Sequence, residues 1–538
     1  MTNKAMQIRL GAIISYIAIF VSTVSALLYT PWMKNQIGDA NYGLYTLVGS
    51  LITIFLMDFG LSTAVSRFIS KYRAENNEKA IKDVMGYVFK LFVIIDIVIA
   101  AVLVGVYFFI EGIFRGLTPD EIETLKKLFI VFGTYSVVSF PFMPLPGILN
   151  AYEKFTQLKL CDMLQKVLTI VLVVAVLFLD YGVVALVLMN AVAGAISILA
   201  RLIILKRSGI GMPNFKVRDR EMFKSLLGFS VWVTVLAFAQ RMIFNLAPSI
   251  LGVVSNSMEI ARFAPASQLE GYFYTFAFAI NGLFMPTVAR YDVANDEKNF
   301  YNLFKKVGRY QICVLGLLFV GLTVVGTDFM SLWMGSEYRI SGWCVVALII
   351  PCLLMYPQQI ANTMISVKNK IKYQAICSLI IGVLNIGLSF GLAAKWGALG
   401  SSISIGISYL VYFVLMNIVY KWQLGLKLKD FYTGVYLRYI PLILVAIAGG
   451  FASCYFLPIY GWIGFLLKVV ICTAIYALVI GVFGFTRHER RSFLNALSRK
   501  LNKNPATVAA APVTVESASV DSGNNVDATN DSDDGSLE

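Results

Sequence analysis

The residues in this sequence most capable of chemistry are charged side chains within long apolar segments. Asp58 and Arg67 flank Gly60 in the stretch FLMDFGLSTAVSRFISKY, which spans residues 55–72. A charge at the centre of a membrane helix costs about 2.5–3.5 kcal/mol on insertion scales, so each charge needs a partner. At about 100° per residue, one continuous helix would place Asp58 and Arg67 on roughly opposite faces. Each must therefore be neutralised by another helix, a water-filled cavity, a headgroup or a ligand.

The composition shows which kind of element must position these charges. Of 538 residues, 58% are hydrophobic and 14% are charged, and the mean hydropathy is +0.74. Soluble domains have about 25% charged residues, so the chain is expected to cross a membrane many times. The net charge is +14, and the seven acids of residues 504–538 leave +21 on the preceding residues. Cytoplasmic loops of membrane proteins collect Lys and Arg, which explains the basic balance without nucleic acid.

Apolar windows of about 20 residues predict fourteen spans. Their approximate bounds are 10–30, 42–66, 83–110, 124–150, 157–179, 182–205, 225–254, 259–287, 311–334, 341–366, 373–394, 397–420, 438–458 and 461–485. With a cytoplasmic N-terminus, the inner segments hold 33 Lys and Arg residues and the outer loops hold 6, in strict alternation. This asymmetry predicts an even number of spans with both termini in the cytoplasm.

Features of the first six spans return in the same order six spans later. AVSRF (64–68) ends the second span and TVARY (287–291) ends the eighth. The fourth and tenth spans both carry prolines that we expect to bend their helices, namely Pro141, Pro144, Pro351 and Pro357. The expected architecture is all-α, with two parallel six-helix repeats. We expect an N-terminal lobe (1–206), a cytoplasmic linker (207–224), a C-terminal lobe (225–420), an extra helix pair (421–486) and a cytoplasmic tail (487–538), basic and then acidic and disordered.

The stretch IGDANYGLYTLVGSLITIFLMDFGLSTAVSRFISKY, together with FMPTVARY (284–291), resembles Wzx-type polysaccharide flippases of the multidrug/oligosaccharidyl-lipid/polysaccharide exporter (MOP) superfamily. The resemblance implies the two-lobed fold of MATE and MurJ transporters, in a bacterial cytoplasmic membrane. It also implies flipping of a polyprenyl-pyrophosphate-linked oligosaccharide for cell-surface polysaccharide synthesis, by alternating access. The partners implied are this lipid-linked glycan and membrane lipids, with H⁺ or Na⁺ and other polysaccharide-assembly proteins as candidates.

Such a substrate needs cationic groups at membrane depth to replace the water around its phosphates. Arg241 lies near the middle of its span, and Lys90 and Lys166 lie about two turns into theirs. We therefore expect a cavity lined by Arg241, Lys90, Lys166, Gln240 and Asn245. Arg67 and Arg290 lie near inner span ends, where they either capture phosphate or anchor the helices at the interface. Arg201, Arg262 and Lys468 are close enough to span ends to reach the headgroups.

Acidic residues at depth suggest a second role. Asp58, Asp96 and Glu270 are candidates for ion coupling or for fixed pairing between helices, and Asp58 could pair with Lys90. Asp162 and Lys166 are spaced to pair within one helix. Gly60 is expected to permit a close approach of helices.

Three alternatives remain open at this stage. A drug or cation antiporter of the same superfamily would have a more aromatic and acidic cavity. A lipid II flippase would show much the same sequence features as a polysaccharide flippase. A glycan polymerase or ligase would need catalytic groups on a large outer loop, and the outer loops are short. The seven cysteines lack metal-binding spacing, so neither a metal nor another cofactor is expected. The chain is interpreted as a transporter rather than an enzyme.

Overall fold

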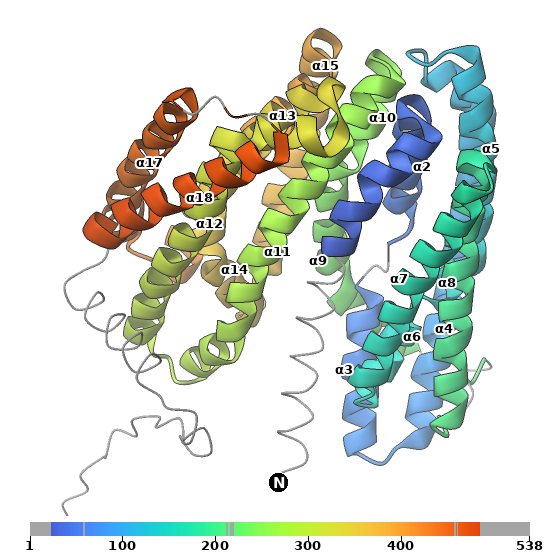
Figure 1. Ribbon diagram of the computed structural model, residues 1–538. Helices are drawn as coiled ribbons and strands as arrows, with labels where there is room; N and C mark the ends of the chain where they lie inside the picture. The colour runs from blue at the N-terminus through green and yellow to red at the C-terminus, as the bar shows by residue number, and fades with distance from the viewer. Residues whose placement is uncertain are drawn as a thin grey trace, which may run out of the picture. The chain divides into compact units, whose positions relative to one another are not determined.

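The computed structural model describes residues 23–484, apart from 58–59, 211–212, 216–219, 457–458 and 460. Throughout this part of the chain the regular elements are helices, and no strand occurs (Figure 1). The predicted all-α fold is therefore confirmed. Asp58, most of the predicted first span and the tail (487–538) lie outside the described residues.

Ten helical segments of the described chain are long and apolar enough to cross a membrane. One of them, α15 (Ile371–Leu424), covers two predicted spans, and the two helices that correspond to them meet at a kink at Gly397. The helix α11 (Ser257–Val293) is long, but its charged and polar residues keep it out of this set. The membrane character is confirmed, and the count of fourteen spans stays a prediction.

The N-terminal half, here residues 23–207, begins with a helix over 23–37. The elements that follow are α2 (Asp39–Phe55), α3 (Leu61–Ala74), α4 (Glu78–Ile113), α5 (Pro119–Ser139), the 3₁₀ turn η1 (Phe140–Phe142), α6 (Leu145–Ala151), α7 (Phe155–Phe178) and α8 (Gly182–Arg207).

The predicted second span is not one helix. α2 ends at Phe55 and α3 begins at Leu61, with Gly60 in the left-handed region at φ 66°. Only glycine adopts this conformation without strain, so Gly60 starts a new helix. The close helix approach expected at Gly60 stays a prediction. The break also removes the premise that placed Asp58 and Arg67 on opposite faces of a single helix.

The C-terminal half, here residues 220–424, has a similar order of elements, but its early helix break lies in its first span rather than its second. It contains α9 (Arg220–Phe244), α10 (Leu246–Val254), α11, α12 (Glu297–Met334), the 3₁₀ turn η2 (Ser336–Tyr338), α13 (Arg339–Met355), the 3₁₀ turn η3 (Tyr356–Gln358), α14 (Gln359–Val367) and α15.

Proline-containing interruptions occur at matching places in the two halves. In the N-terminal half, η1 contains Pro141, and Pro144 is the N-cap of α6. In the C-terminal half, Pro351 lies inside α13 and Pro357 lies in η3. A proline lacks the backbone N–H that continues an α-helix, which is why each span passes through a 3₁₀ turn here.

The last elements form the predicted additional helix pair. They are α16 (Leu428–Phe431), the π-helix η4 (Tyr432–Tyr436), α17 (Leu437–Phe456), α18 (Gly461–Val479) and the π-helix η5 (Ile480–Gly484). Both α17 and α18 pack on α12. Lys468 of α18 forms an ion pair with Asp328 of α12 at 2.7 Å, so this lysine is neutralised within the protein.

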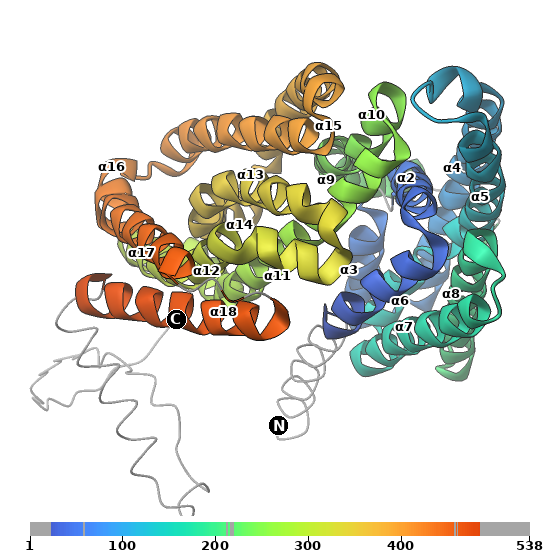
Figure 2. The ribbon, with the colours of Figure 1, turned by 45° about the horizontal axis from the view of Figure 1, so that its top comes forward.

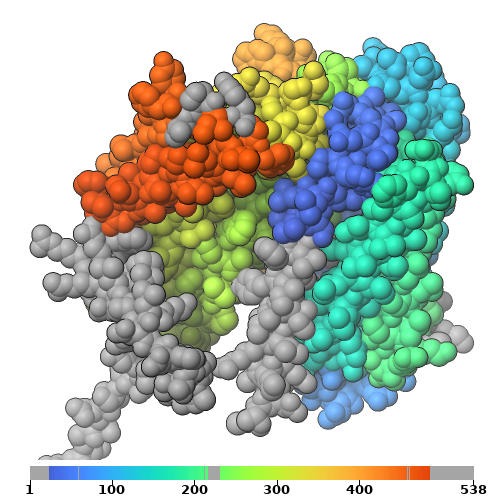
Figure 3. Space-filling view, viewed as in Figure 1, coloured from blue at the N-terminus to red at the C-terminus, as the bar shows by residue number. Residues whose placement is uncertain are grey.

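The helix α2 joins the two halves. It packs on α5 of its own half and on α10 and α11 of the other, and it lies between these elements in Figure 2. Gly43 makes the approach possible, because a Cβ at this position would collide with the backbone carbonyl of Ser257 on α11. In Figure 3, the blue N-terminal segment lies against yellow and red-orange segments from the C-terminal part of the chain. The surfaces of the two halves therefore meet along α2.

Candidate functional site

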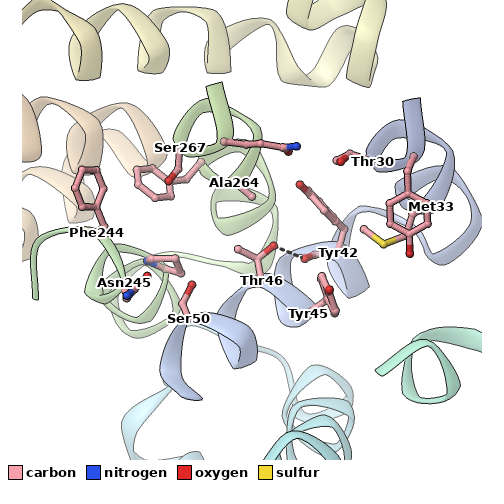
Figure 4. Close-up of a pocket in the computed structure, with 14 residues that line it drawn as sticks. Thr30, Met33, Tyr42, Tyr45, Thr46, Ser50, Phe244, Asn245, Ala264 and Ser267 are labelled. Carbon is pink, nitrogen blue, oxygen red and sulfur yellow. Dashed lines mark hydrogen bonds between the residues drawn. The ribbon is translucent and has the colours of Figure 1, made fainter. Parts of the chain in front are cut away.

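A pocket of about 280 Å³ lies between the two halves. We call it the central pocket. Side chains from the helix 23–37 and from α2 face side chains of α9, α10 and α11 across it (Figure 4). Its lining consists of Tyr29, Thr30, Met33, Tyr42, Tyr45, Thr46, Ser50, Phe244, Asn245, Pro248, Phe263, Ala264, Ser267 and Gln268.

The chemistry of the central pocket is polar and aromatic without charge. None of its lining residues is Asp, Glu, Lys, Arg or His. Thr46 donates a hydrogen bond to the backbone carbonyl of Tyr42 at 3.0 Å, and Gln268 donates to the Tyr272 hydroxyl at 2.8 Å. Within the described part of the chain, the side chains of Ser50, Asn245 and Ser267 have no hydrogen-bond partner. These hydroxyl and amide groups are available to a ligand.

A second pocket, the acidic pocket, adjoins the central pocket and shares Phe244 and Ser267 with it. It lies within the C-terminal half, has a volume of about 430 Å³ and is lined by Gln240, Ile243, Phe244, Ser267, Glu270, Gly271, Tyr274, Met355, Tyr356, Gln359, Asn362, Gln374, Ser378, Ile381, Tyr409 and Tyr412. Glu270 is 3% exposed and accepts a hydrogen bond from the Tyr356 hydroxyl at 3.0 Å. The thiol of Cys352 lies 3.7 Å from the same carboxylate oxygen. The hydrogen-bonded carboxylate and the tyrosines around it can hold a cation or a proton.

Four residues join the two halves at the end that the loop charges predict to be extracytoplasmic. We call Lys34, Asp39, Trp333 and Tyr338 the outer cluster. Lys34 pairs with Asp39 at 3.0 Å and donates a hydrogen bond to the carbonyl of Met334 at 3.0 Å. The Tyr338 hydroxyl donates a hydrogen bond to Asp39 at 2.7 Å. The Trp333 indole N–H donates to the backbone carbonyl of Leu27, on the helix 23–37, at 2.6 Å. Three of these contacts, from Lys34 to Met334, from Tyr338 to Asp39 and from Trp333 to the helix 23–37, join the two halves. The ion pair between Lys34 and Asp39 supports them from within the N-terminal half.

Arg241, the first candidate for the cavity, instead bridges the two halves. Its guanidinium donates a hydrogen bond to the backbone carbonyl of Thr53. Thr53 lies in the last turn of α2, where carbonyls have no partner within the helix and the helix dipole favours a cation. Lys34 contacts the end of α12 in the same way, through the carbonyl of Met334. A basic residue of each half therefore satisfies a helix C-terminus of the other.

The other predicted basic residues also lie away from the two pockets. Lys90 is half-buried on α4, and Lys166 is exposed on α7. Arg67 is exposed in the middle of α3, and Arg290 is exposed in the last turn of α11. None of them lines the central or the acidic pocket, whereas the uncharged candidates do, with Gln240 in the acidic pocket and Asn245 in the central one. The lining of these two pockets therefore includes none of the cations that we expected, and their role stays a prediction.

Several charges at depth are paired within the protein. Asp162 forms ion pairs with Arg201 at 2.9 Å and with Lys159 at 3.4 Å, in place of the expected pair with Lys166. Arg262 forms ion pairs with Glu259 at 2.6 Å and Glu337 at 3.2 Å. Asp96 is buried, and its Oδ1 atom has no hydrogen-bond partner among the described residues. The proposed pair between Asp58 and Lys90 lies outside the described part of the chain.

A family model described as polysaccharide biosynthesis protein matches residues 8–291, more than half of the chain. The chain belongs to this family. The lining residues of the central pocket, from Tyr29 to Gln268, all lie within the match. The sequence-based assignment to a polysaccharide biosynthesis family is thereby confirmed at the level of the family.

A curated relative, the probable low-salt glycan biosynthesis flippase Agl15 of Haloferax volcanii, is 20% identical over 203 residues. These residues are 38% of this chain and 42% of the relative, so the match spans about two fifths of that protein.

Two solved structures share the fold of this polysaccharide biosynthesis family member. The lipid II flippase MurJ in an inward closed conformation gives a TM-score of 0.71 at 17% identity, over 90% of this chain and 99% of that one. An inward-facing multidrug resistance MATE family transporter of the MOP superfamily gives 0.65 at 15% identity, over 77% and 98%. At these identities the likeness shows the fold alone, and it confirms the predicted MATE- and MurJ-like architecture.

Sequence reasoning did not predict the lining of the central pocket beyond Asn245. Tyr42 and Tyr45 belong to the stretch that carries the family resemblance, and this was the available signal for a role of α2 in the site. Hydroxyl and aromatic side chains are common in membrane helices, however, and their positions in the sequence do not show which of them face the same space.

Proposed function

We propose that this protein flips a polyprenyl-pyrophosphate-linked oligosaccharide across the bacterial cytoplasmic membrane, by alternating access between its two halves. The observation that carries the proposal is the uncharged polar pocket between the halves of a polysaccharide biosynthesis family member. A glycan presents many hydroxyl groups and cannot enter hydrocarbon, so it needs hydrogen-bonding partners at membrane depth. The hydroxyl and amide groups of the central pocket meet this requirement.

The polyprenyl tail needs an apolar surface, and the structure offers one beside the halves. A pocket of about 330 Å³ is lined by Leu27, Leu269, Leu317, Leu318, Gly321, Leu322, Val325, Gly326, Phe329, Phe465, Val469, Cys472 and Thr473. It is bounded by the helix 23–37, α11, α12 and α18. Leu27 also accepts the hydrogen bond from Trp333 of the outer cluster, so this surface adjoins the contact between the halves. An isoprenoid chain can therefore remain in an apolar environment while the sugar moves.

The pyrophosphate requires cations, and Arg241 remains our first candidate. In the present conformation its guanidinium is used by the carbonyl of Thr53. Separation of α2 from α9 would break this bond, and the guanidinium could then form charge-assisted hydrogen bonds with phosphate oxygens. Arg67 and Arg290 are exposed near the inner ends of the predicted second and eighth spans, where they can make first contact with the phosphates. Lys90 and Lys166 are kept as weaker candidates, because the described pockets do not include them.

Movement of the halves would take place around the helix interruptions. We propose that Pro141 and Pro144, with Pro351 and Pro357 in the other half, are the bending points, because each pair lies in or beside a 3₁₀ turn or within the helix that leads into it. Backbone groups freed at such turns allow a change of helix direction at low cost.

A second candidate function is exchange of an organic cation for H⁺ or Na⁺. The acidic pocket favours it, because Glu270 and the surrounding tyrosines form the aromatic and acidic cavity that sequence reasoning associated with an antiporter. In the flippase, the same carboxylate would instead couple glycan movement to an ion gradient. Asp58 and Asp96 remain further candidates for this coupling.

A transport assay with purified protein in proteoliposomes distinguishes the two functions. The probes are polyprenyl-pyrophosphoryl glucose and the organic cation ethidium, each tested with and without proton and sodium gradients. Flipping of the lipid-linked sugar above protein-free vesicles supports the proposal. Movement of ethidium without movement of the lipid would replace it by the antiporter.

Arg241 can be tested in the same vesicles. We expect Arg241→Ala to reduce flipping by about tenfold or more, since one charge-assisted hydrogen bond is worth about 1.5–3 kcal/mol. Arg241→Lys keeps the positive charge but not the two-pronged geometry, and should recover part of the rate. Equal rates for the wild type and Arg241→Ala would remove Arg241 from phosphate binding.

A further inference from the structure

We infer that the central pocket selects an uncharged sugar unit, so that the glycan it binds is neutral at that position. This inference rests on the proposed function and names the substrate class of the same site. Its starting point is the lining of the pocket, which includes five aromatic rings (Tyr29, Tyr42, Tyr45, Phe244 and Phe263) and six other polar side chains (Thr30, Thr46, Ser50, Asn245, Ser267 and Gln268), with no charged residue among them.

A neutral sugar is suited to these groups. Its hydroxyls can donate to and accept from hydroxyl and amide side chains, and its C–H faces can lie on aromatic rings. Ser50 and Asn245 come from different halves and have no partner within the described part of the chain, so a sugar between them would receive hydrogen bonds from both sides.

An acidic sugar would lose its hydration here without gaining a counter-ion. A carboxylate taken out of water pays a penalty of several kcal/mol unless a cation neutralises it. Nearby charged groups do not supply a counter-ion in this conformation. Lys34 of the outer cluster is already paired with Asp39, and the Arg241 guanidinium donates to the carbonyl of Thr53. Glu270 of the adjoining acidic pocket carries the same sign as the substrate carboxylate. The pyrophosphate is not subject to this exclusion, because it would lie outside the central pocket, near basic residues.

The binding of a neutral sugar would also bias the movement of the halves. Because the lining comes from both halves, a bound sugar stabilises conformations in which α2 and α11 remain on either side of it. A ligand shifts a conformational equilibrium only through such differential contacts. A sugar that the pocket rejects would therefore fail both to bind and to favour this closed arrangement.

The test compares two probes that differ in one group. Polyprenyl-pyrophosphoryl glucose and polyprenyl-pyrophosphoryl glucuronic acid carry the same lipid and the same ring stereochemistry. With wild-type protein in proteoliposomes, we expect glucose to be flipped at least about tenfold faster, which corresponds to about 1.4 kcal/mol. Equal rates would overturn the selectivity while leaving flipping intact. If neither lipid moves, the proposed function itself fails.

A variant that introduces a counter-ion makes the test directional. Ser50→Arg places a cation in the pocket, so the ratio of glucuronic acid to glucose flipping should rise by about tenfold or more. Gln268→Lys, from the other half, should change the ratio in the same direction and guards against misfolding of the first variant. Ser70→Arg is the matched control, because Ser70 is exposed on α3, outside the central pocket. An unchanged ratio in both folded pocket variants would overturn the inference.

Discussion

Removal of the Tyr338 hydroxyl should release the outer end of the contact between the two halves. This hydroxyl donates a 2.7 Å hydrogen bond to Asp39, and the Tyr338 side chain is fully buried. A hydrogen bond to a charged group contributes about 1.5–3 kcal/mol. Asp39 keeps Lys34 as a partner, and water can replace part of the lost bond once the halves separate, so we use the lower end of this range. At about 1.4 kcal/mol per factor of ten, Tyr338→Phe should raise the population open at the outer end about tenfold.

Cysteine labelling from the outside of the membrane measures this population. Ser50→Cys is introduced into a chain whose seven cysteines are replaced by alanine, so that the only thiol lies in the central pocket. A membrane-impermeant maleimide reaches it from the outer end only when the outer cluster opens. The labelling rate in the Tyr338→Phe background should therefore be about tenfold higher than in the Tyr338 parent.

Tyr476→Phe provides the control for loss of a tyrosine hydroxyl. Its hydroxyl donates a 2.7 Å hydrogen bond to the carbonyl of Cys313, which joins α18 to α12 and leaves the contact between the halves untouched. This variant should label at the parental rate. A labelling rate within twofold of the parent for Tyr338→Phe, or an equal increase in Tyr476→Phe, would refute the reasoning.

Two further predictions concern glycine and acid positions. Gly182 and Gly397 both have positive φ, 75° and 53°, but a Cβ would have no neighbour within 4 Å at Gly182 and would collide with Glu259 at Gly397. Gly182→Ala should therefore lower the free energy of unfolding by about 1 kcal/mol through backbone strain alone. Gly397→Ala should lower it clearly more, because the Glu259 carboxylate also accepts a 2.7 Å hydrogen bond from the Ala398 amide. Thermal unfolding of the two purified variants measures which loss is larger, and equal losses would contradict the prediction. Glu270→Gln keeps the size of the side chain and its hydrogen bond from Tyr356 but cannot carry a proton or balance a cation. Gradient-driven flipping should therefore fall at least about tenfold, while flipping without a gradient persists. Proteoliposomes with an imposed proton or sodium gradient measure both rates, and full retention of gradient dependence would exclude Glu270 as the coupling group.

Local sequence patterns predicted the helical elements well where one helix corresponds to one apolar run. The predicted span 157–179 is α7 (Phe155–Phe178), and the predicted turn before residue 397 is the kink of α15. The prediction was wrong for the second span, because hydropathy averages over a window and does not detect the left-handed Gly60 between α2 and α3. A helix break inside an apolar run is a matter of backbone conformation, which composition does not report.

The candidate site was harder to predict. The free-energy cost of burying a charge shows which charged side chains need a partner, but it does not show which partner each of them has. Arg241 was singled out for its depth, and in the structure a backbone carbonyl of α2 accepts its hydrogen bond. Lys468 was expected to reach the headgroups, and it pairs with Asp328. In both cases the partner lies far away in the sequence, and it lies within reach only after the helices have packed.

The sequence by itself determined the class of this protein, the repeated order of its helices and the family to which it belongs. These properties depend on composition and on short stretches of residues, which act locally on hydropathy, turns and helix ends. Only the tertiary structure decided that uncharged hydroxyl, amide and aromatic groups face one another between the halves, while the deep cations lie elsewhere. The physical reason is that the face of each helix that meets the pocket depends on its rotation against helices hundreds of residues away, and no local pattern encodes that rotation.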